Sequence, residues 1–336
     1  MSAVKFKLDL NLKSSSNTIQ YQHKTLLIGS CFTENMGAKL QYHLFDTFEN
    51  PHGILFNPVS VQNALTDYVT NKQYTISDLF LLNEVWNSWH HHSRFSGITQ
   101  QAALDKINGS IQQAHLYLKT AQQLVITLGS AWVYELTELA PGGVGQVVAN
   151  NHKAPANWFT KRLLKPTELL KSLQELTQML ISFNPNLQII FTISPVRHLR
   201  EGLVENNRSK AVLIQAVHDL IESTQQVAYF PAYELVIDDL RDYRFYAEDL
   251  VHPNYAATTY VWEKFVASYM TPETQVIMKQ VAELQLAMNH KPFFEGSSEH
   301  QKFLHNCLGK TEQLQRQCPY LPLQNHLQFF KSQIGK

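Results

Sequence analysis

The stretch Lys24-Thr25-Leu26-Leu27-Ile28-Gly29-Ser30-Cys31-Phe32-Thr33-Glu34-Asn35-Met36-Gly37 predicts how the fold begins. Its apolar run, residues 26–28, is short and ends at Gly29, which is typical of a buried parallel strand. We expect a helix from about Thr33, an N-cap residue type with Glu34 in the first turn. Ser30 and Cys31 would then lie at the helix N-terminus, where backbone N–H groups favour a thiolate and a developing oxyanion.

A second segment, Ala247-Glu248-Asp249-Leu250-Val251-His252-Pro253-Asn254, places an acid three residues before a histidine. The Asp249 carboxylate can accept from one ring nitrogen of His252 and leave the other facing a nucleophile. An activated hydroxyl or thiol needs such a base and a group that orients it. Together the two segments predict a hydrolase-type centre with Ser30 or Cys31 as nucleophile.

Strand-like and helix-like segments alternate along the chain. Apolar runs at residues 26–28, 124–128, 187–193 and 227–237 predict strands, and periodic patterns at 102–118, 167–181 and 209–222 predict helices, the last with Ser209 near its N-cap. This alternation predicts an α/β fold with a parallel, doubly wound sheet. Such sheets bind ligands beyond the carboxyl ends of their strands, where Cys31, Gly129 and Ser194 fall.

These residues resemble the GSCFA family, bacterial proteins named for a Gly-Ser-Cys-Phe signature and placed in the SGNH/GDSL hydrolase superfamily. The signature is Gly29-Ser30-Cys31-Phe32, and further matching segments are residues 89–96, 126–132, 151–153, 194–198, 209–211 and 242–246. The resemblance spans roughly residues 20–270. It implies a three-layer α/β/α sandwich with a flavodoxin-like sheet, a nucleophile after the first strand and the Asp-x-x-His pair near the end.

The resemblance also implies an oxyanion hole, formed by a glycine after the second strand and an asparagine in a Gly-x-Asn-Asp segment after the third. Gly53 can stand for the glycine. In the segment that begins at Gly129, Ala131 stands where the asparagine is expected. Asn151 is a candidate to replace the missing asparagine in the oxyanion hole. The alternative is that Asn151 and its polar neighbours only form a turn.

The resemblance leaves two registers for the nucleophile. Aligning Gly29 to Thr33 without a gap against the Gly-Asp-Ser-x-Thr pattern of the superfamily places Cys31 at the serine position. A shift of one residue places Ser30 there. We favour Cys31, because a thiol beside a histidine at a helix N-terminus is chemically competent. The alternative is a buried, inert cysteine.

Composition excludes several classes of protein. The 336 residues include 28 basic and 28 acidic side chains, so no net field favours nucleic acid or an anionic membrane. The three cysteines have no C-x-x-C spacing, which indicates neither a disulfide framework nor a structural zinc site. Residues 1–10 lack the apolar core of a signal peptide and no 18-residue apolar run exists, so we expect a cytoplasmic protein without membrane insertion.

Three regions are expected: an N-terminal arm at residues 1–24, the SGNH-like domain at 25–270 and a C-terminal helical extension at 271–336. Residues 132–164 have little periodicity and predict a long insertion near the site. The extension has helical patterns at 273–288 and 298–314. It is expected to pack on the core or to mediate association, and the sequence leaves the oligomeric state open.

Two other polar clusters carry side chains that suit a ligand or a metal ion. His90-His91-His92 resembles a metal site, but adjacent side chains diverge, so at most two could share an ion. Arg197-His198 follows a strand end, and Arg241 and Arg244 precede the Asp-x-x-His loop. Arginine suits carboxylate or phosphate groups of a substrate, although surface ion pairing is the simpler interpretation.

The sequence thus predicts an ester hydrolase acting on an acylated small molecule or glycan, with no metal or organic cofactor. Its predicted site comprises Cys31 or Ser30, His252 and Asp249, with Gly53, Gly129, Asn151, Arg197 and His198 as oxyanion or substrate-binding residues. An O-acyltransferase on the same scaffold is one alternative. A binding module without turnover is another, because Ala131 replaces the expected asparagine.

Overall fold

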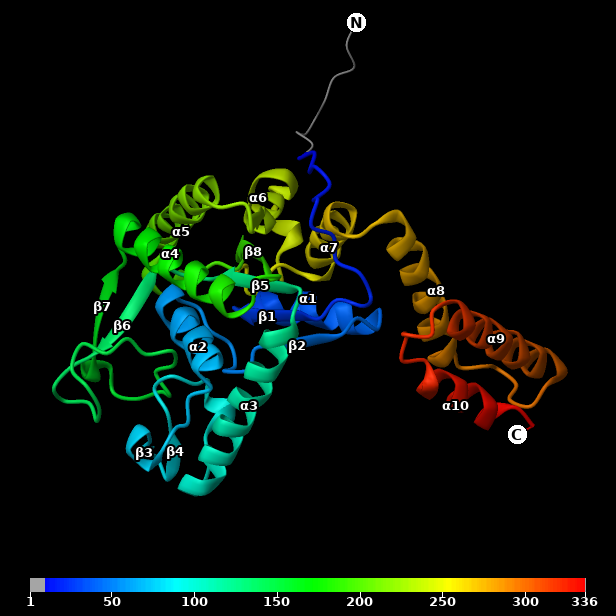
Figure 1. Ribbon diagram of the computed structural model, residues 1–336, viewed down its shortest axis with the longest axis horizontal. Helices are drawn as coiled ribbons and strands as arrows, with labels where there is room; N and C mark the ends of the chain where they lie inside the picture. Colours follow the sequence, from blue (N-terminus) through cyan, green and yellow to red (C-terminus); the bar gives the residue numbers. More distant parts are fainter. Residues whose placement is uncertain (1–9, 336) are drawn as a thin grey trace, which may run out of the picture.

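The computed structural model describes residues 10–335 and has a parallel sheet at its centre (Figure 1). Within those residues five strands form this sheet in the order β2-β1-β5-β8-β9. Numbered along the chain, this is the 2-1-3-4-5 order of flavodoxin-like, doubly wound folds. The α/β prediction is therefore confirmed. The strands are β1 (Thr25–Gly29), β2 (Thr47–Glu49), β5 (Gln123–Leu128), β8 (Gln188–Ile193) and β9 (Val227–Phe230).

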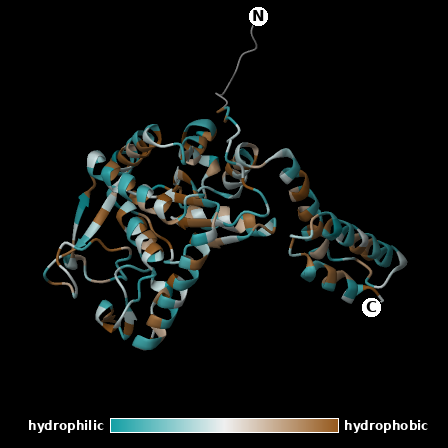
Figure 2. Ribbon diagram, in the orientation of Figure 1, coloured by the Kyte–Doolittle hydropathy of each residue, from teal (hydrophilic) through white to brown (hydrophobic). Residues whose placement is uncertain are grey.

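Helices cover both faces of the sheet because successive strand residues point to opposite sides. Leu26 and Ile28 belong to the apolar cluster under α2 to α5, whereas Leu27 belongs to the cluster under α1 and α7. Figure 2 shows hydrophobic residues concentrated on the central strands. The helices are α1 (Cys31–Tyr42), α2 (Pro58–Thr70), α3 (Gln100–Thr120), α4 (Pro166–Phe183), α5 (Leu203–Ser223), α6 (Ala232–Glu234), α7 (Tyr255–Tyr269), α8 (Pro272–Met288), α9 (Ser298–Gln317) and α10 (Gln324–Gln333).

Two antiparallel hairpins lie outside the main sheet. One pairs β3 (Phe80–Leu82) with β4 (Val85–Asn87), and the other pairs β6 (Trp132–Leu136) with β7 (Phe159–Leu163). The predicted insertion at 132–164 is thus partly regular structure. Its loop is held by Trp89, whose indole Nε1 donates to Pro141 O at 2.7 Å and whose carbonyl accepts from Ala149 N at 2.8 Å.

Three predicted boundaries were wrong. Helix α1 begins at Cys31 with Ser30 as its N-cap, two residues before the expected start. Helix α5 begins at Leu203, so Ser209 lies inside the helix and is not its cap. The strand predicted at 227–237 ends at Phe230, because Pro231 has no N–H for the ladder, and α6 and the π-helix η5 (Leu235–Leu240) follow.

Residues 10–24, the described part of the predicted N-terminal arm, pack against the core. Ile19 is fully buried and its N–H donates to Tyr269 O at 2.7 Å, and Tyr21 stacks on Phe45 with ring centroids 4.2 Å apart. The sequence of residues 1–10 predicts no signal-peptide core. Residues 1–9 lie outside the described residues. No helix among residues 10–335 is long and apolar enough to cross a membrane.

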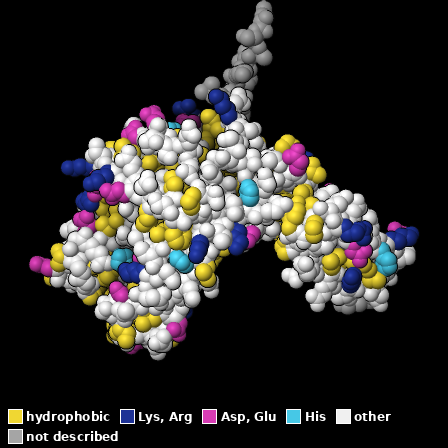
Figure 3. All heavy atoms as spheres, in the orientation of Figure 1, with side chains coloured by type: hydrophobic (Ala, Val, Ile, Leu, Met, Phe, Trp, Pro, Cys, Tyr) yellow, Lys and Arg dark blue, Asp and Glu magenta, His cyan; other side chains and the backbone are white. Residues whose placement is uncertain are grey.

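The C-terminal residues form helices, as predicted, and α10 is an addition that the sequence patterns missed. Helix α8 leads away from the sheet to α9 and α10, which lie at the opposite end of the molecule from the β6–β7 hairpin (Figure 1). Acidic and basic side chains are interspersed over the face shown in Figure 3, which agrees with the balanced charge of the sequence.

Gly29 and Gly109 provide a matched test of the strand-to-helix turn. Gly29 has φ +138°, and a Cβ there would lie 2.1 Å from Thr127 O, whereas a Cβ on Gly109 in α3 meets no atom within 4 Å. We expect Gly29→Ala to lower the free energy of unfolding by at least about 3 kcal/mol. Gly109→Ala should raise it by about 0.5–1 kcal/mol, because alanine favours helix. Urea denaturation measures both, and equal stability of the two variants would contradict the close approach at Gly29.

Candidate active site

The Asp-x-x-His loop holds its two side chains in the orientation that the sequence predicted. Asp249 Oδ2 lies 2.7 Å from His252 Nδ1, and Oδ1 accepts from the backbone N–H groups of Val251 and His252 at 2.9 and 3.0 Å. These bonds, above all those from the His252 backbone and ring, lower the pKa of Asp249 to about 2. The imidazole is thereby fixed through Nδ1, and Nε2 remains for another partner.

Arg197 fastens this loop to the end of β8. Its backbone N–H donates to Val251 O at 3.2 Å, and its guanidinium lies 4.3 Å from the Tyr246 ring centroid and 5.2 Å from that of Tyr243. Arg244 ion-pairs with Asp242 at 3.8 Å. Arg197 therefore supports the loop as well as lining the cavity described below.

Ser30 and Cys31 have different surroundings. Ser30 is fully buried, and its Oγ accepts from Phe32 N at 3.3 Å as the N-cap of α1. Cys31 is the first residue of the helix and is partly exposed. Burial raises the pKa of the Cys31 thiol, while the N–H groups of Cys31 and Phe32 and the ammonium of Lys210 act in the opposite direction. The lowered thiol pKa expected from the helix N-terminus is therefore wrong, because desolvation outweighs it.

A cavity of about 560 Å³ joins most of the predicted site residues. Cys31 and His252 lie on its wall together with Asn151, Arg197 and His198. These residues come from α1, the loop before η3 (Ala156–Trp158), the end of β8 and the Asp-x-x-His loop. The cavity is also lined by Phe56, Asn57, Ser130, Trp132, Tyr134, Asn150, Arg200 and Glu201.

Gly53 and Gly129, which the sequence predicted as oxyanion or substrate-binding residues, both use their backbone N–H groups within the protein. The Gly53 N–H donates to Asn50 O at 2.7 Å, and the Gly129 N–H donates to Phe56 O at 2.8 Å, so both donors are already bonded within loops. Neither glycine is among the residues that line the cavity. Ala131 is fully buried, and its N–H donates to Ser209 Oγ at 2.7 Å.

His198 brings a buried ring nitrogen to the cavity wall. Its Nε2 is buried and has no hydrogen-bond partner among residues 10–335. Burial, followed by the positive charges that Lys210 and His252 can carry, lowers the pKa of His198 to about 4. The imidazole is therefore neutral at pH 7, and one of its two nitrogens carries a proton that it can donate.

A second cavity, of about 840 Å³, meets the first at Cys31. It lies between α1 and α7 and is lined by Glu34, Asn35, Lys39, Tyr42, His43, Tyr255, Thr258, Thr259 and Trp262. Lys39 Nζ donates to Thr259 Oγ1 at 3.3 Å across this groove. Cys31 is thus accessible from two sides.

The sequence was compared with protein families. Residues 24–265 match the model of the GSCFA family, and residues 281–336 match that of the GSCFA domain protein C-terminal domain. The chain belongs to the GSCFA family. Its sequence matches none of the curated proteins with which it was compared.

Solved structures similar to this GSCFA protein include three esterases. The acetyl xylan esterase Est2A of the rumen bacterium Butyrivibrio proteoclasticus has a TM-score of 0.38 and 11% sequence identity. The match covers 75% of this chain and 64% of the length of Est2A. A Clostridium thermocellum family 3 carbohydrate esterase has a TM-score of 0.32 and 9% identity over 77% of this chain and 98% of its own. A family 3 carbohydrate esterase of Talaromyces cellulolyticus has a TM-score of 0.34 and 9% identity, with coverages of 76% and 98%. Similarity at this level does not establish a shared activity.

Lys210 is a buried charged residue of this GSCFA protein that the sequence interpretation missed. It is fully buried and bonded to the carbonyl oxygens of Gly129 and Ser194. The signal was present in the sequence, because Lys210 lies three residues before Leu213 and seven before Val217, on the apolar stripe of its helix. A lysine on such a stripe is buried at a cost, which its two hydrogen bonds to carbonyl oxygens offset.

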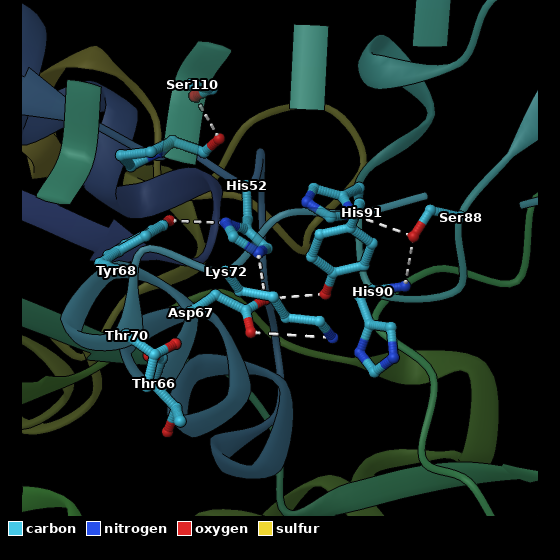
Figure 4. Close-up of polar contacts among 12 residues, drawn as sticks. His52, Thr66, Asp67, Tyr68, Thr70, Lys72, Ser88, His90, His91 and Ser110 are labelled. Atoms are coloured by element: carbon cyan, nitrogen blue, oxygen red, sulfur yellow. Dashed lines mark hydrogen bonds and ion pairs between the residues drawn. The ribbon is translucent and has the colours of Figure 1, made fainter. Parts of the chain in front are cut away.

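The His90-His91-His92 segment of this GSCFA protein supports a buried polar network (Figure 4). The three rings diverge: His90 Nε2 contacts Gln146 Nε2 at 2.8 Å, His91 stacks on His52 at 4.1 Å, and His92 Nδ1 accepts from Arg94 N at 3.3 Å. No group of three or more metal-ligating side chains occurs in the part of the chain that the structure describes.

His52 is the centre of this network. Its Nε2 lies 3.2 Å from Asp67 Oδ2 and its Nδ1 2.9 Å from Tyr68 Oη, and Tyr74 Oη donates to Asp67 Oδ2 at 2.7 Å. A carboxylate only accepts, so the neutral ring donates from Nε2 and accepts the Tyr68 hydroxyl at Nδ1. Burial lowers the pKa of His52 and of His91 and thus keeps both rings neutral.

We expect this protein to lose stability as the pH falls below about 6.5. Burial lowers the pKa of His90 to about 4, whereas the unfolded chain binds a proton near pH 6.5. Since the unfolded state then holds more protons, the free energy of unfolding decreases as the pH falls through that value. Between pH 6.5 and pH 5 the decrease in the free energy of unfolding should be smaller by about 1.5 kcal/mol in His90→Gln than in the wild type. His305→Gln on the exposed face of α9 is the matched control, and identical pH profiles in urea denaturation would contradict the prediction.

Proposed function

We propose that this GSCFA protein hydrolyses esters through a covalent acyl-enzyme formed on Cys31. The supporting observation is that Cys31, at the first turn of α1, and His252, oriented by Asp249, line one cavity. Ser30 is buried as the helix cap and does not line that cavity, which favours Cys31 as the nucleophile. A nucleophile after the first strand with Asp-x-x-His near the last is the arrangement of the SGNH/GDSL superfamily, to which we assign the fold.

In the first half of the proposed reaction, Cys31 Sγ attacks the acyl carbonyl carbon and His252 Nε2 takes the thiol proton. The carbonyl π electrons move to oxygen. When they return, the C–O bond to the alcohol breaks, and His252 gives the proton to the leaving oxygen. In the second half, His252 takes a proton from water, the hydroxide attacks the thioester, and Sγ leaves with that proton.

We propose three donors for the oxyanion. The N–H of Cys31 has no intrahelical acceptor because it belongs to the first turn of α1. The side chains of Asn151 and His198 line the same cavity and can each supply an N–H. Such donors act in a partly desolvated site, where their effect on a developing charge is large.

The substrate class that we propose is an acyl ester of a small molecule or glycan. The cavity offers ring faces from Trp132 and Tyr134 and guanidinium groups from Arg197 and Arg200. An O-acyltransferase is the second candidate, because two cavities meet at Cys31. An acyl donor in one and an acceptor alcohol in the other would both reach the nucleophile.

We expect the wild type to turn over p-nitrophenyl acetate. Cys31→Ala and His252→Ala should each lower kcat/KM by about 10² or more, because nucleophile and base are removed. Ser30→Ala, which removes a helix cap, should lower the free energy of unfolding by about 1 kcal/mol and keep most of the activity.

Spectrophotometric release of p-nitrophenol measures these rates, and intact-mass spectrometry detects the acyl group on Cys31. An active Cys31→Ala with an inactive, folded Ser30→Ala would reassign the nucleophile to Ser30. Turnover of an ester only when an alcohol acceptor is added would establish the transferase. No turnover or acyl adduct over a panel of esters and acceptors would refute the enzyme and leave a binding module.

A further inference from the structure

The groove between α1 and α7 is the larger of the two cavities that meet at Cys31, with a volume of about 840 Å³. Residues three or four positions apart on each helix face it. On α1 they are Glu34, Asn35, Ala38, Lys39 and Tyr42, with His43 directly after the helix, and on α7 they are Tyr255, Thr258, Thr259 and Trp262. Small-molecule sites in proteins have volumes of about 300–1,000 Å³, so the groove is large enough for a ligand of its own.

Aromatic rings line both walls of the groove. Tyr255, the first residue of α7, is 80% exposed, and Tyr42 on α1 is exposed as well. Trp262 is buried and stacks on His43 with ring centroids 5.8 Å apart. The C–H groups of a saturated sugar ring carry a slight positive charge and pack on the electron-rich face of an aromatic ring. The exposed Tyr255 ring can therefore stack on such a ligand.

The polar groups of the groove also belong to both walls. Lys39 Nζ donates to Thr259 Oγ1 at 3.3 Å and lies 5.3 Å from the centroid of the Tyr255 ring. An ammonium has three N–H donors, and this bond uses one of them, while the Thr259 hydroxyl can still donate its proton. Asn35 Nδ2 donates to Cys31 O at 3.3 Å, and the Asn35 Oδ1 can accept. The hydroxyl groups of a ligand would thus meet both donors and acceptors.

Other classes of ligand fit this lining less well. An anion would meet one ammonium, Lys39, and one carboxylate, Glu34, which pairs with Arg94 at 3.1 Å. A fatty acyl chain needs aliphatic walls, and Ala38 is the one aliphatic side chain among the described residues that line the groove. An extended peptide binds to the edge of a sheet, whereas both walls here are helices. A neutral ligand with many hydroxyl groups, which is a carbohydrate, fits best.

We propose that the groove between α1 and α7 binds a neutral carbohydrate, with one sugar ring stacked on Tyr255. Hydroxyl groups of the sugar bond to Asn35, Lys39 and Thr259. Because Cys31 lines this groove and the first cavity, a sugar held here lies beside the thiol. The carbohydrate is then the alcohol part of the ester substrate, and this last step rests on the proposed function.

Tyr255 and Phe294 are a matched pair of exposed aromatic side chains. Phe294 is 78% exposed but lies in the loop between α8 and α9 and not among the residues that line the groove. Tyr255→Ala removes the stacking face, Tyr255→Phe keeps it, and Phe294→Ala is the control. Since both side chains are exposed, we expect all three variants to fold, which circular dichroism checks.

The experiment is the binding of three neutral disaccharides, cellobiose, xylobiose and N,N′-diacetylchitobiose, to the full chain, measured by titration with saturation-transfer difference NMR. We expect at least one of them to bind. Tyr255→Ala should weaken its binding about two- to tenfold, whereas Tyr255→Phe and Phe294→Ala should match the wild type. Binding of none of the three, or equal affinities of Tyr255→Ala and Phe294→Ala, would overturn the proposal. Equally tight binding of the tripeptide Gly-Ala-Gly would overturn the assignment to carbohydrate.

The rate of Cys31 alkylation by iodoacetamide tests where the sugar lies. The bound disaccharide should slow alkylation in the wild type and in Phe294→Ala, and should slow it less in Tyr255→Ala at the same concentration. Unchanged alkylation with the disaccharide bound would overturn the proposal. Neither measurement needs an ester, so disaccharide binding without turnover of any ester would support the groove and refute the catalytic role of Cys31.

Discussion

The close contact between Gly29 and Thr127 determines where the two candidate nucleophiles, Ser30 and Cys31, lie. No side chain fits at Gly29, and its φ of +138° turns the chain from β1 directly into α1. The next residue, Ser30, is drawn inward as the helix cap, and Cys31 is left at the rim of the cavity. One backbone turn therefore buries the Ser30 hydroxyl and leaves the Cys31 thiol accessible.

The loops at this edge of the sheet are held by side chains that are distant in sequence. Asn50 Oδ1 accepts from Gly29 N at 2.9 Å, Phe56 O accepts from both Gly129 N and Ser130 N, and Lys210 binds two further carbonyls. Each loop thus provides hydrogen-bond partners for backbone groups of another loop. Such reciprocal bonding limits the rearrangement of the loops around the cavity.

Sequence patterns predicted the elements whose apolar residues are continuous, such as β5 and β8, and both members of the Asp-x-x-His pair. They missed β2, because Thr47-Phe48-Glu49 is short and only half buried. They placed the helix start at Thr33 because serine and threonine are both good caps, and only the packing of Gly29 selects Ser30. The roles of Gly53 and Gly129 could not be predicted, since the sequence does not show which acceptor uses a backbone N–H. Lys210 was recognisable by its helical spacing, but its partners were not.

Asn254 separates the histidine loop from α7 and caps that helix, with Oδ1 accepting from Ala257 N at 3.1 Å. Helix α7 in turn rests on α1, where His43 stacks on Trp262 at 5.8 Å. Cys31 begins one of these helices and His252 lies three residues before the other, so the spacing between thiol and imidazole depends on how closely the two helices pack. A molecule entering the groove between them would push the two helices apart, and its thickness would set the distance between the Cys31 thiol and the His252 imidazole.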